Sequence, residues 1–159
     1  MSKAILPGSY DPITLGHAEI IKKAARDFDS VYVALMINPE KKYMFSSEDR
    51  VKMANLACAE LANVEVIYDE GLLTDLFDKL GADVIVKGIC NEADRAYEEG
   101  MARYNENANP RAKTLLVPCD LEYANISSSA VREAIKRKDR ATLVGMLDAR
   151  VIEYLESLI

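Results

Sequence analysis

Hydrophobic and polar positions along the chain follow two alternating periods, one typical of strands and the other of helices. Short apolar runs rich in β-branched and aromatic residues predict five strands, at 4–6, 31–37, 64–68, 83–86 and 113–118. Apolar residues spaced by three to four positions predict helices at 17–28, 46–61, 72–80 and 92–107. The remaining segments predict a helix that begins at Ser127–Ser129, followed by short helices from Asp139 and Asp148.

A strand–helix–strand order repeated along the chain indicates an α/β fold. We expect a Rossmann-like, doubly wound sheet of five parallel strands, followed by C-terminal helices. No linker, repeat or low-complexity segment divides the sequence, so we expect a single domain over residues 1–159. Ligands of such sheets bind beyond the carboxyl ends of the strands, where the strand order reverses. The loops after strands one, two, four and five are therefore the candidate site.

Composition limits the classes of function that remain. Twenty Lys and Arg residues against 26 Asp and Glu give a net charge of −6, which argues against a broad basic surface for nucleic acid. The single histidine, His17, excludes catalytic or metal sites that need two or more histidines. The apolar runs are too short to cross a membrane, and Pro7-Gly8 interrupts any signal-peptide core. We expect a soluble, cytoplasmic protein without membrane or nucleic-acid partners.

The cysteines are few and far apart. Cys58, Cys90 and Cys119 are odd in number and widely spaced, which favours reduced thiols over a disulfide framework or a zinc site. Cys58 falls on the apolar side of its helix and is expected in the core. None of the three is expected to be a catalytic nucleophile.

The loop after the first strand carries the most distinctive pattern, from Pro7 to His17. Gly8 and Gly16 allow close approach of the backbone, and His17 lies where a helix begins. The amides and dipole of a helix start favour phosphate, and an imidazole there can donate to a phosphate oxygen in a transition state. The alternative is a structural histidine that only caps or packs at the helix start.

The three other loops add cations and hydroxyl groups. The second loop contains Lys41 and Lys42, and the fourth strand ends in Lys87-Gly88, where a lysine can act as a point charge for phosphate. The last loop runs from Tyr123 to Ser129 and ends in three serines at a helix start. These serines either provide a second phosphate contact or simply cap the helix.

The order of these segments carries a specific resemblance. Thr14-Leu15-Gly16-His17 matches the (H/T)xGH signature of the nucleotidylyltransferase superfamily, and the chain from Ala4 to about Leu155 resembles the bacterial phosphopantetheine adenylyltransferase family. The shared stretches are PGSYDPITLGH, NPEKKYMFSSEDRV, NVEV, VKG and YANISSSAVRE. The resemblance implies direct in-line transfer of the adenylyl group of ATP to 4′-phosphopantetheine, giving dephospho-coenzyme A and pyrophosphate. It also implies a Mg²⁺ ion on the triphosphate, a homohexamer and feedback binding of coenzyme A.

Roles for individual residues follow from the same resemblance. It implies that His17 stabilises the transition state and that Lys41 orients the phosphate of phosphopantetheine. It implies that this substrate also contacts Ser9, Leu73 and Lys87. The ATP-binding residues it implies are Ser9, Tyr10 (through its backbone), His17, Gly88, Ile89, Cys90, Glu98, Tyr123, Ala124, Asn125, Ile126, Ser127, Ser128 and Ser129. No side chain is expected to form a dedicated metal site.

One segment departs from the family pattern. The family usually has Arg-Gly-Leu/Ile-Arg at the end of the fourth strand, where this chain has Lys87-Gly88-Ile89-Cys90. Lysine keeps the charge but lacks the planar fork, and Cys90 loses a charge-assisted contact of about 1.5–3 kcal/mol. Arg95 and Arg132 are the candidate replacements. Two alternatives therefore stay open: a related enzyme that acts on another small phosphate, and a catalytically weak paralogue that only binds nucleotide or a coenzyme A-like ligand.

Overall fold

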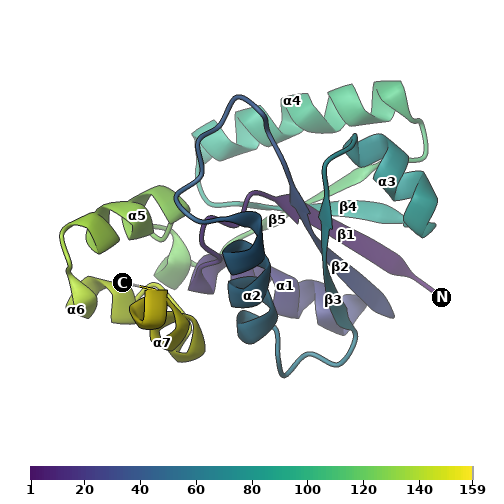
Figure 1. Ribbon diagram of the computed structural model, residues 1–159. Coiled ribbons are helices and arrows are strands. Elements are labelled where there is room, and N and C mark those ends of the chain that lie inside the picture. Colours follow the sequence, from purple (N-terminus) through teal and green to yellow (C-terminus); the bar gives the residue numbers. More distant parts are fainter. Residues whose placement is uncertain (159) are drawn as a thin grey trace.

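A five-stranded parallel sheet lies at the centre of the structure, with helices on both faces (Figure 1). The structure is a computed structural model, and it describes residues 1–158. The strands are β1 (Lys3–Gly8), β2 (Ser30–Met36), β3 (Val64–Asp69), β4 (Val84–Ile89) and β5 (Thr114–Pro118). The helices are α1 (Leu15–Asp27), α2 (Ser47–Ala57), α3 (Leu73–Leu80), α4 (Glu92–Ala108), α5 (Ser128–Lys136), α6 (Arg140–Val144) and α7 (Ala149–Leu158), with a 3₁₀ turn η1 (Leu121–Tyr123) before α5.

The strand order is β3-β2-β1-β4-β5, and every pair of neighbours is parallel. From β1 the chain winds outward through β2 to β3, and then crosses to the other side of β1 to form β4 and β5. The order therefore reverses between β1 and β4, which is where such sheets bind ligands. The predicted doubly wound fold with C-terminal helices is confirmed.

Alternation along the strands divides the apolar residues between two cores. Ala4 and Leu6 face a large core formed with α1, α2 and α5 to α7, whereas Ile5 faces a smaller core formed with α3. Figure 1 shows α3 and α4 on one face of the sheet and α1 and α2 on the other. Within the described residues, no helix combines the length and the apolar character needed to cross a membrane.

Helix α2 begins close to its expected start at residue 46 but ends before its expected end at residue 61. Ser46 is the N-cap, and its hydroxyl accepts a hydrogen bond from the Asp49 amide (3.1 Å). The Asp49 carboxylate does not complete a capping box; it accepts a hydrogen bond from the Tyr154 hydroxyl (2.6 Å) and so joins α2 to α7. The helix ends at Ala57 rather than at residue 61, because the chain turns at Cys58, whose carbonyl accepts from the Leu61 amide.

The expectation of reduced thiols is wrong for two of the three cysteines. Cys90 and Cys119 form a disulfide, with their Cα atoms 5.2 Å apart. The cause is strand register: Ile89 of β4 lies opposite Pro118 of β5, so the residues that follow the two parallel strands are neighbours. Their separation of 29 positions gives no hint of this pairing. Cys58 is free and buried in the core as predicted, and burial raises the pKa of its thiol to about 11.

Candidate active site

A pocket of about 440 Å³ opens at the carboxyl ends of β1 and β4, where the strand order reverses. The loops after β1, β2, β4 and β5 all contribute to it, as the sequence predicts. Twelve of the predicted site residues line this pocket: Ser9, Tyr10, His17, Lys41, Lys87, Gly88, Cys90, Glu98, Ile126, Ser127, Ser128 and Ser129.

The other predicted site residues lie outside the pocket walls. Leu73 is the first residue of α3 and packs beside the smaller core, and Ile89 is buried at the end of β4. The pocket lining also leaves out Tyr123, Ala124 and Asn125, which belong to η1 and the turn after it. The implied roles of these five residues remain predictions.

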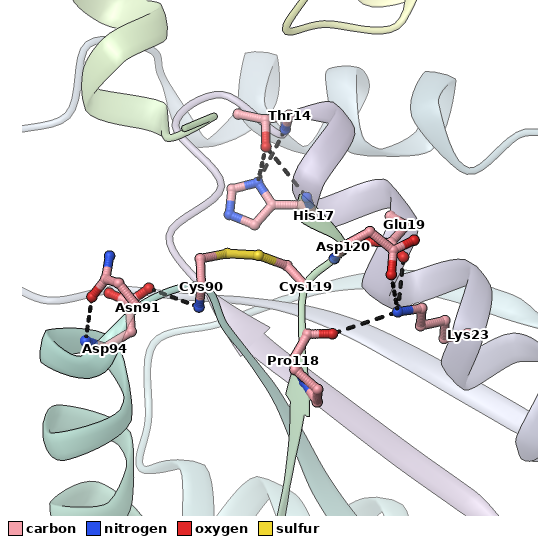
Figure 2. Close-up of a disulfide and its surroundings, with 10 residues drawn as sticks. All are labelled: Thr14, His17, Glu19, Lys23, Cys90, Asn91, Asp94, Pro118, Cys119 and Asp120. Carbon is pink, nitrogen blue, oxygen red and sulfur yellow. Dashed lines mark hydrogen bonds and ion pairs between the residues drawn. A yellow bond between two sulfur atoms is a disulfide. The ribbon is translucent and has the colours of Figure 1, made fainter. Parts of the chain in front are cut away.

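His17 occupies the third position of α1, where its ring closes a capping box with Thr14 (Figure 2). The Thr14 amide donates to Nδ1 of His17 (3.0 Å), and the His17 amide donates to the Thr14 hydroxyl (3.3 Å). Because a backbone amide can only donate, Nδ1 carries no proton and the ring hydrogen resides on Nε2. This assignment leaves an Nε2–H donor on a residue that lines the pocket.

The surroundings of His17 keep its ring neutral. His17 is only partly exposed to solvent, and protein atoms surround its ring. This burial is the main cause that lowers the pKa of the ring to about 4. The positive charge of Lys87 lowers the pKa further. A neutral imidazole with its hydrogen on Nε2 acts as a hydrogen-bond donor, not as a cation. His17 therefore caps α1 and also presents a donor on the pocket side, and its role at a phosphate remains a prediction.

Tyr10 packs behind His17 and turns the loop. Its ring meets the His17 ring edge-on, with centroids 4.9 Å apart, and its hydroxyl donates to the Leu6 carbonyl (2.9 Å). The backbone of Tyr10 has a φ of 48°, in the left-handed region. A Cβ at position 8 would lie 3.0 Å from the Tyr10 ring, so Gly8 gives this ring room to pack closely against the end of β1. Because the side chain is used for packing, the backbone of Tyr10 is the part left for a ligand.

Three cationic side chains line the pocket, although the chain as a whole is acidic. The Lys41 ammonium donates to the Ser9 hydroxyl (3.3 Å), and it forms no ion pair within residues 1–158. Lys87 lies 3.4 Å from Oε2 of Glu98 and donates to the Pro7 carbonyl (3.3 Å). This concentration of positive charge suits anionic ligands.

The third cation is Arg132, which with Arg95 is one of the two candidates to replace the arginine that the family usually has at position 90. Arg132 lines the pocket, donating to the Asp11 carbonyl (2.9 Å) and to the Ser129 hydroxyl (3.1 Å). Arg95 faces Glu92 at 3.9 Å and does not line the pocket. Of the two candidates, Arg132, on the second turn of α5, is therefore the one that lines the pocket.

The three serines before and in α5 have different partners. Ser127 is the N-cap, and its hydroxyl accepts from the Ala130 amide (3.1 Å). Ser128 donates to the Pro12 carbonyl (2.9 Å), which joins the start of α5 to the first loop. Ser129 accepts from Arg132. Capping therefore explains only Ser127, whereas Ser128 connects α5 to the first loop and Ser129 holds Arg132 within the same helix.

Sequence reasoning missed a buried clamp formed by Asp11 and Arg50, which are 3% and 2% exposed. The Asp11 carboxylate accepts from the amides of Met44 (2.8 Å) and Phe45 (3.0 Å). Arg50 donates to the Ser9 carbonyl (2.9 Å) and to the Phe45 carbonyl (3.3 Å). The clamp thus fixes the loop that carries Lys41 against the loop that carries Ser9. Its one sequence signal is Arg50 itself, a charge on the apolar stripe of α2 beside Met53, Ala54 and Ala57.

Comparisons with known proteins agree with this geometry. A family model described as cytidylyltransferase-like matches residues 5–134. The phosphopantetheine adenylyltransferase of Symbiobacterium thermophilum is 44% identical over 133 residues, which cover 84% of this chain and 82% of that protein. The one from Limosilactobacillus fermentum is 36% identical over 157 residues, covering 99% and 90%.

A solved structure supports the fold. It is described as a nicotinate-nucleotide adenylyltransferase from Vibrio parahaemolyticus, and it superimposes with a TM-score of 0.72 at 23% identity, over 99% of this chain and 93% of that one. The chain belongs to the cytidylyltransferase-like family and, within it, to the phosphopantetheine adenylyltransferases.

Proposed function

We propose that the protein transfers the adenylyl group of ATP to 4′-phosphopantetheine, yielding dephospho-coenzyme A and pyrophosphate for coenzyme A biosynthesis. One observation carries the proposal. In a chain 44% identical to a phosphopantetheine adenylyltransferase, His17 is held as a neutral Nε2–H donor in a pocket lined by Lys41 and Lys87. That set of groups suits the transfer of one phosphate-linked group between two anionic substrates.

The proposed reaction is a direct displacement at phosphorus. An oxygen of the acceptor phosphate forms a bond to the α-phosphorus of ATP, while the bond from that phosphorus to the bridging oxygen of pyrophosphate breaks. The nucleophile comes from the substrate, so the protein has to supply alignment and charge stabilisation. The absence of a serine, cysteine or lysine nucleophile from the scheme is therefore no obstacle.

The contacts suggest a division of labour among the pocket residues. Ser9 and Lys41, 3.3 Å apart, bind the acceptor phosphate as a hydroxyl and a cation. The Nε2–H of His17 donates to a non-bridging oxygen of the α-phosphate, where negative charge grows in the transition state. Arg132 and the first amides of α5 bind the phosphates that leave as pyrophosphate.

Lys87 and Glu98 work as a pair on the opposite wall. Lys87 is a point charge for the phosphates, and Glu98 holds it at 3.4 Å. Glu98 is 8% exposed, so its charge needs this partner. The pair replaces the bidentate arginine of the family with a cation whose direction is set by a neighbouring carboxylate.

We propose that Mg²⁺ enters with ATP as part of the substrate. The nearby carboxylates already have partners: Asp94 accepts from the Cys90 amide (3.1 Å), and Glu98 faces Lys87. Within residues 1–158, no three His, Cys, Asp or Glu side chains gather as a metal site. This donor set fits an ion held mainly by phosphate oxygens and water, as Mg²⁺ prefers. Turnover that survives removal of Mg²⁺ would contradict this assignment.

Family membership also supports three wider proposals. We propose a homohexamer, a cytoplasmic location and feedback binding of coenzyme A in the same pocket. The exposed residues Tyr97, Met101 and Tyr104 form a stripe along α4 that suits contact with another copy. Light scattering after gel filtration tests the assembly, and competition between coenzyme A and ATP tests the shared pocket.

Steady-state release of pyrophosphate tests the reaction itself. ATP and CTP are each offered with 4′-phosphopantetheine and with other small phosphomonoesters. Turnover only with ATP and 4′-phosphopantetheine supports the proposal, whereas preference for another pair identifies a related enzyme of the same superfamily. Nucleotide binding without turnover identifies a binding paralogue. If His17→Ala abolishes turnover and leaves the circular dichroism spectrum unchanged, the binding-only alternative is excluded.

A further inference from the structure

The Cys90–Cys119 disulfide lies at the nucleotide side of the pocket and takes no part in the scheme above (Figure 2). Cys90 lines the pocket directly after β4, at the position where the family usually has an arginine. Cys119 follows β5, at the head of the segment that leads through η1 to α5. Both residues are half-buried, and Cys90 is the sulfur that small reagents can reach from the pocket side.

The two cysteines lie at the starts of segments that lead to different walls of the pocket. The Cys90 amide donates to the Asp94 carboxylate (3.1 Å), in the first turn of α4, the helix that carries Glu98. The Cys119 amide donates to the Ile89 carbonyl (2.8 Å). The residue after it, Asp120, pairs with Lys23 of α1 at 3.2 Å (Figure 2). The disulfide therefore joins the start of α4 to the segment that delivers the serines of α5.

We propose that Cys90 and Cys119 form a dithiol–disulfide modification site that is coupled to nucleotide binding. The reductant is a dithiol, either a small molecule or a protein. One of its thiolates attacks a sulfur of the pair, which breaks the S–S bond and forms a mixed disulfide. The second thiol of the reductant then attacks this mixed disulfide, and the second protein cysteine leaves as a thiolate. Two electrons and two protons pass from the reductant to the cysteines, and the reductant leaves as its own disulfide.

The coupling to nucleotide arises from preorganisation. The oxidised pair holds the end of β4 against the end of β5, and so fixes two walls of the pocket before ATP arrives. Reduction removes the covalent link, so the start of the 120–127 segment is then held only by the Cys119–Ile89 backbone bond and the Asp120–Lys23 pair, and ATP has to order the segment further on binding. We expect about five- to tenfold weaker ATP binding in the reduced form, at the low end of usual coupling strengths. This inference rests on the proposed function only in taking ATP as the ligand.

Linkage gives a test that needs no catalysis. If oxidation tightens ATP binding by a given factor, ATP must favour the disulfide over the dithiol by the same factor. The full-length protein is equilibrated in mixtures of reduced and oxidised dithiothreitol, with and without saturating ATP. It is then quenched in acid and alkylated, and the number of blocked thiols is read by mass spectrometry. Calorimetry measures ATP binding to the fully reduced and fully oxidised forms.

We expect two thiols to disappear together, and ATP to shift the midpoint five- to tenfold toward the disulfide. Cys58→Ala is the matched control and should keep this behaviour, whereas Cys90→Ser and Cys119→Ser should each abolish it. The inference fails, and the proposed function does not, if no disulfide forms at any dithiothreitol ratio. The same holds if calorimetry shows that ATP binds but ATP does not shift the midpoint. If ATP binds neither form and no turnover occurs, the proposed function fails as well. Turnover by the reduced protein with equal ATP affinity in both forms overturns only the coupling.

Discussion

Removal of the Asp11 carboxylate should loosen the loop that carries Lys41. The native Asp11 carboxylate is a buried acceptor that lies 2.8 Å from the Met44 amide and 3.0 Å from the Phe45 amide. Asp11→Ala removes this acceptor from both amides. A hydrogen bond to a charged group contributes about 1.5–3 kcal/mol, and the substitution also removes the cost of burying a charge. We therefore expect a loss of about 3 kcal/mol in the free energy of unfolding. Asp11→Asn keeps one acceptor oxygen, so about half of that loss is expected.

Kinetics separate a positioning role from a purely structural one. Urea unfolding followed by circular dichroism measures stability, and pyrophosphate release at saturating ATP measures the KM for 4′-phosphopantetheine. That KM should rise about tenfold in Asp11→Ala, more than the KM for ATP, because Lys41 faces the acceptor phosphate. Lys41→Ala should raise the same KM without changing stability, since its side chain is exposed. A destabilised Asp11→Ala enzyme with an unchanged acceptor KM would refute the positioning argument, and an unchanged stability would refute the energy estimate.

Three further predictions concern the nucleotide side of the pocket. Loss of the Nε2–H donor in His17→Ala should lower kcat by about 10²–10³-fold, measured with both substrates saturating. Arg132→Ala should raise the KM for ATP by about one to two decades, whereas Arg95→Ala, the control outside the pocket, should leave it unchanged. Because the pKa of His17 is lowered to about 4, the unfolded chain takes up this proton first as pH falls. The free energy of unfolding therefore falls as the pH drops from about 6.5, the ordinary pKa of histidine, to about 4. In urea titrations, His17→Gln should weaken this pH dependence.

The strands and the parallel, doubly wound sheet were accessible from the sequence because the patterns of the elements are local. β4 is dense in β-branched residues, β2 combines two valines with a tyrosine, and the helices between strands keep their apolar stripes, so the parallel sheet follows. The site followed from the same topology, since the carboxyl ends of parallel strands meet at one edge. Helix ends were less accessible: the apolar positions after Cys58 continue the stripe of α2 but belong to a turn.

What the sequence did not contain was the pairing of distant residues. The contact between Cys90 and Cys119 depends on the register of β4 against β5, which residue spacing does not encode. The bonds from Asp11 to the second loop span more than 30 positions, and each needs burial to matter. Helical spacing likewise could not tell whether Arg95 or Arg132 faces the pocket. His17 illustrates the difference: its type and position suggested phosphate chemistry, but only the Thr14 amide identifies which ring nitrogen is the donor.

Product analysis of a single reaction mixture tests the central claim most directly. The protein is incubated with Mg²⁺, 4′-phosphopantetheine and an equimolar mixture of ATP and CTP, and the products are identified by mass spectrometry. We expect dephospho-coenzyme A and one equivalent of pyrophosphate, with no cytidylyl product, and loss of both in His17→Ala. A cytidylylated product, or no product from a folded protein that binds ATP, would contradict it.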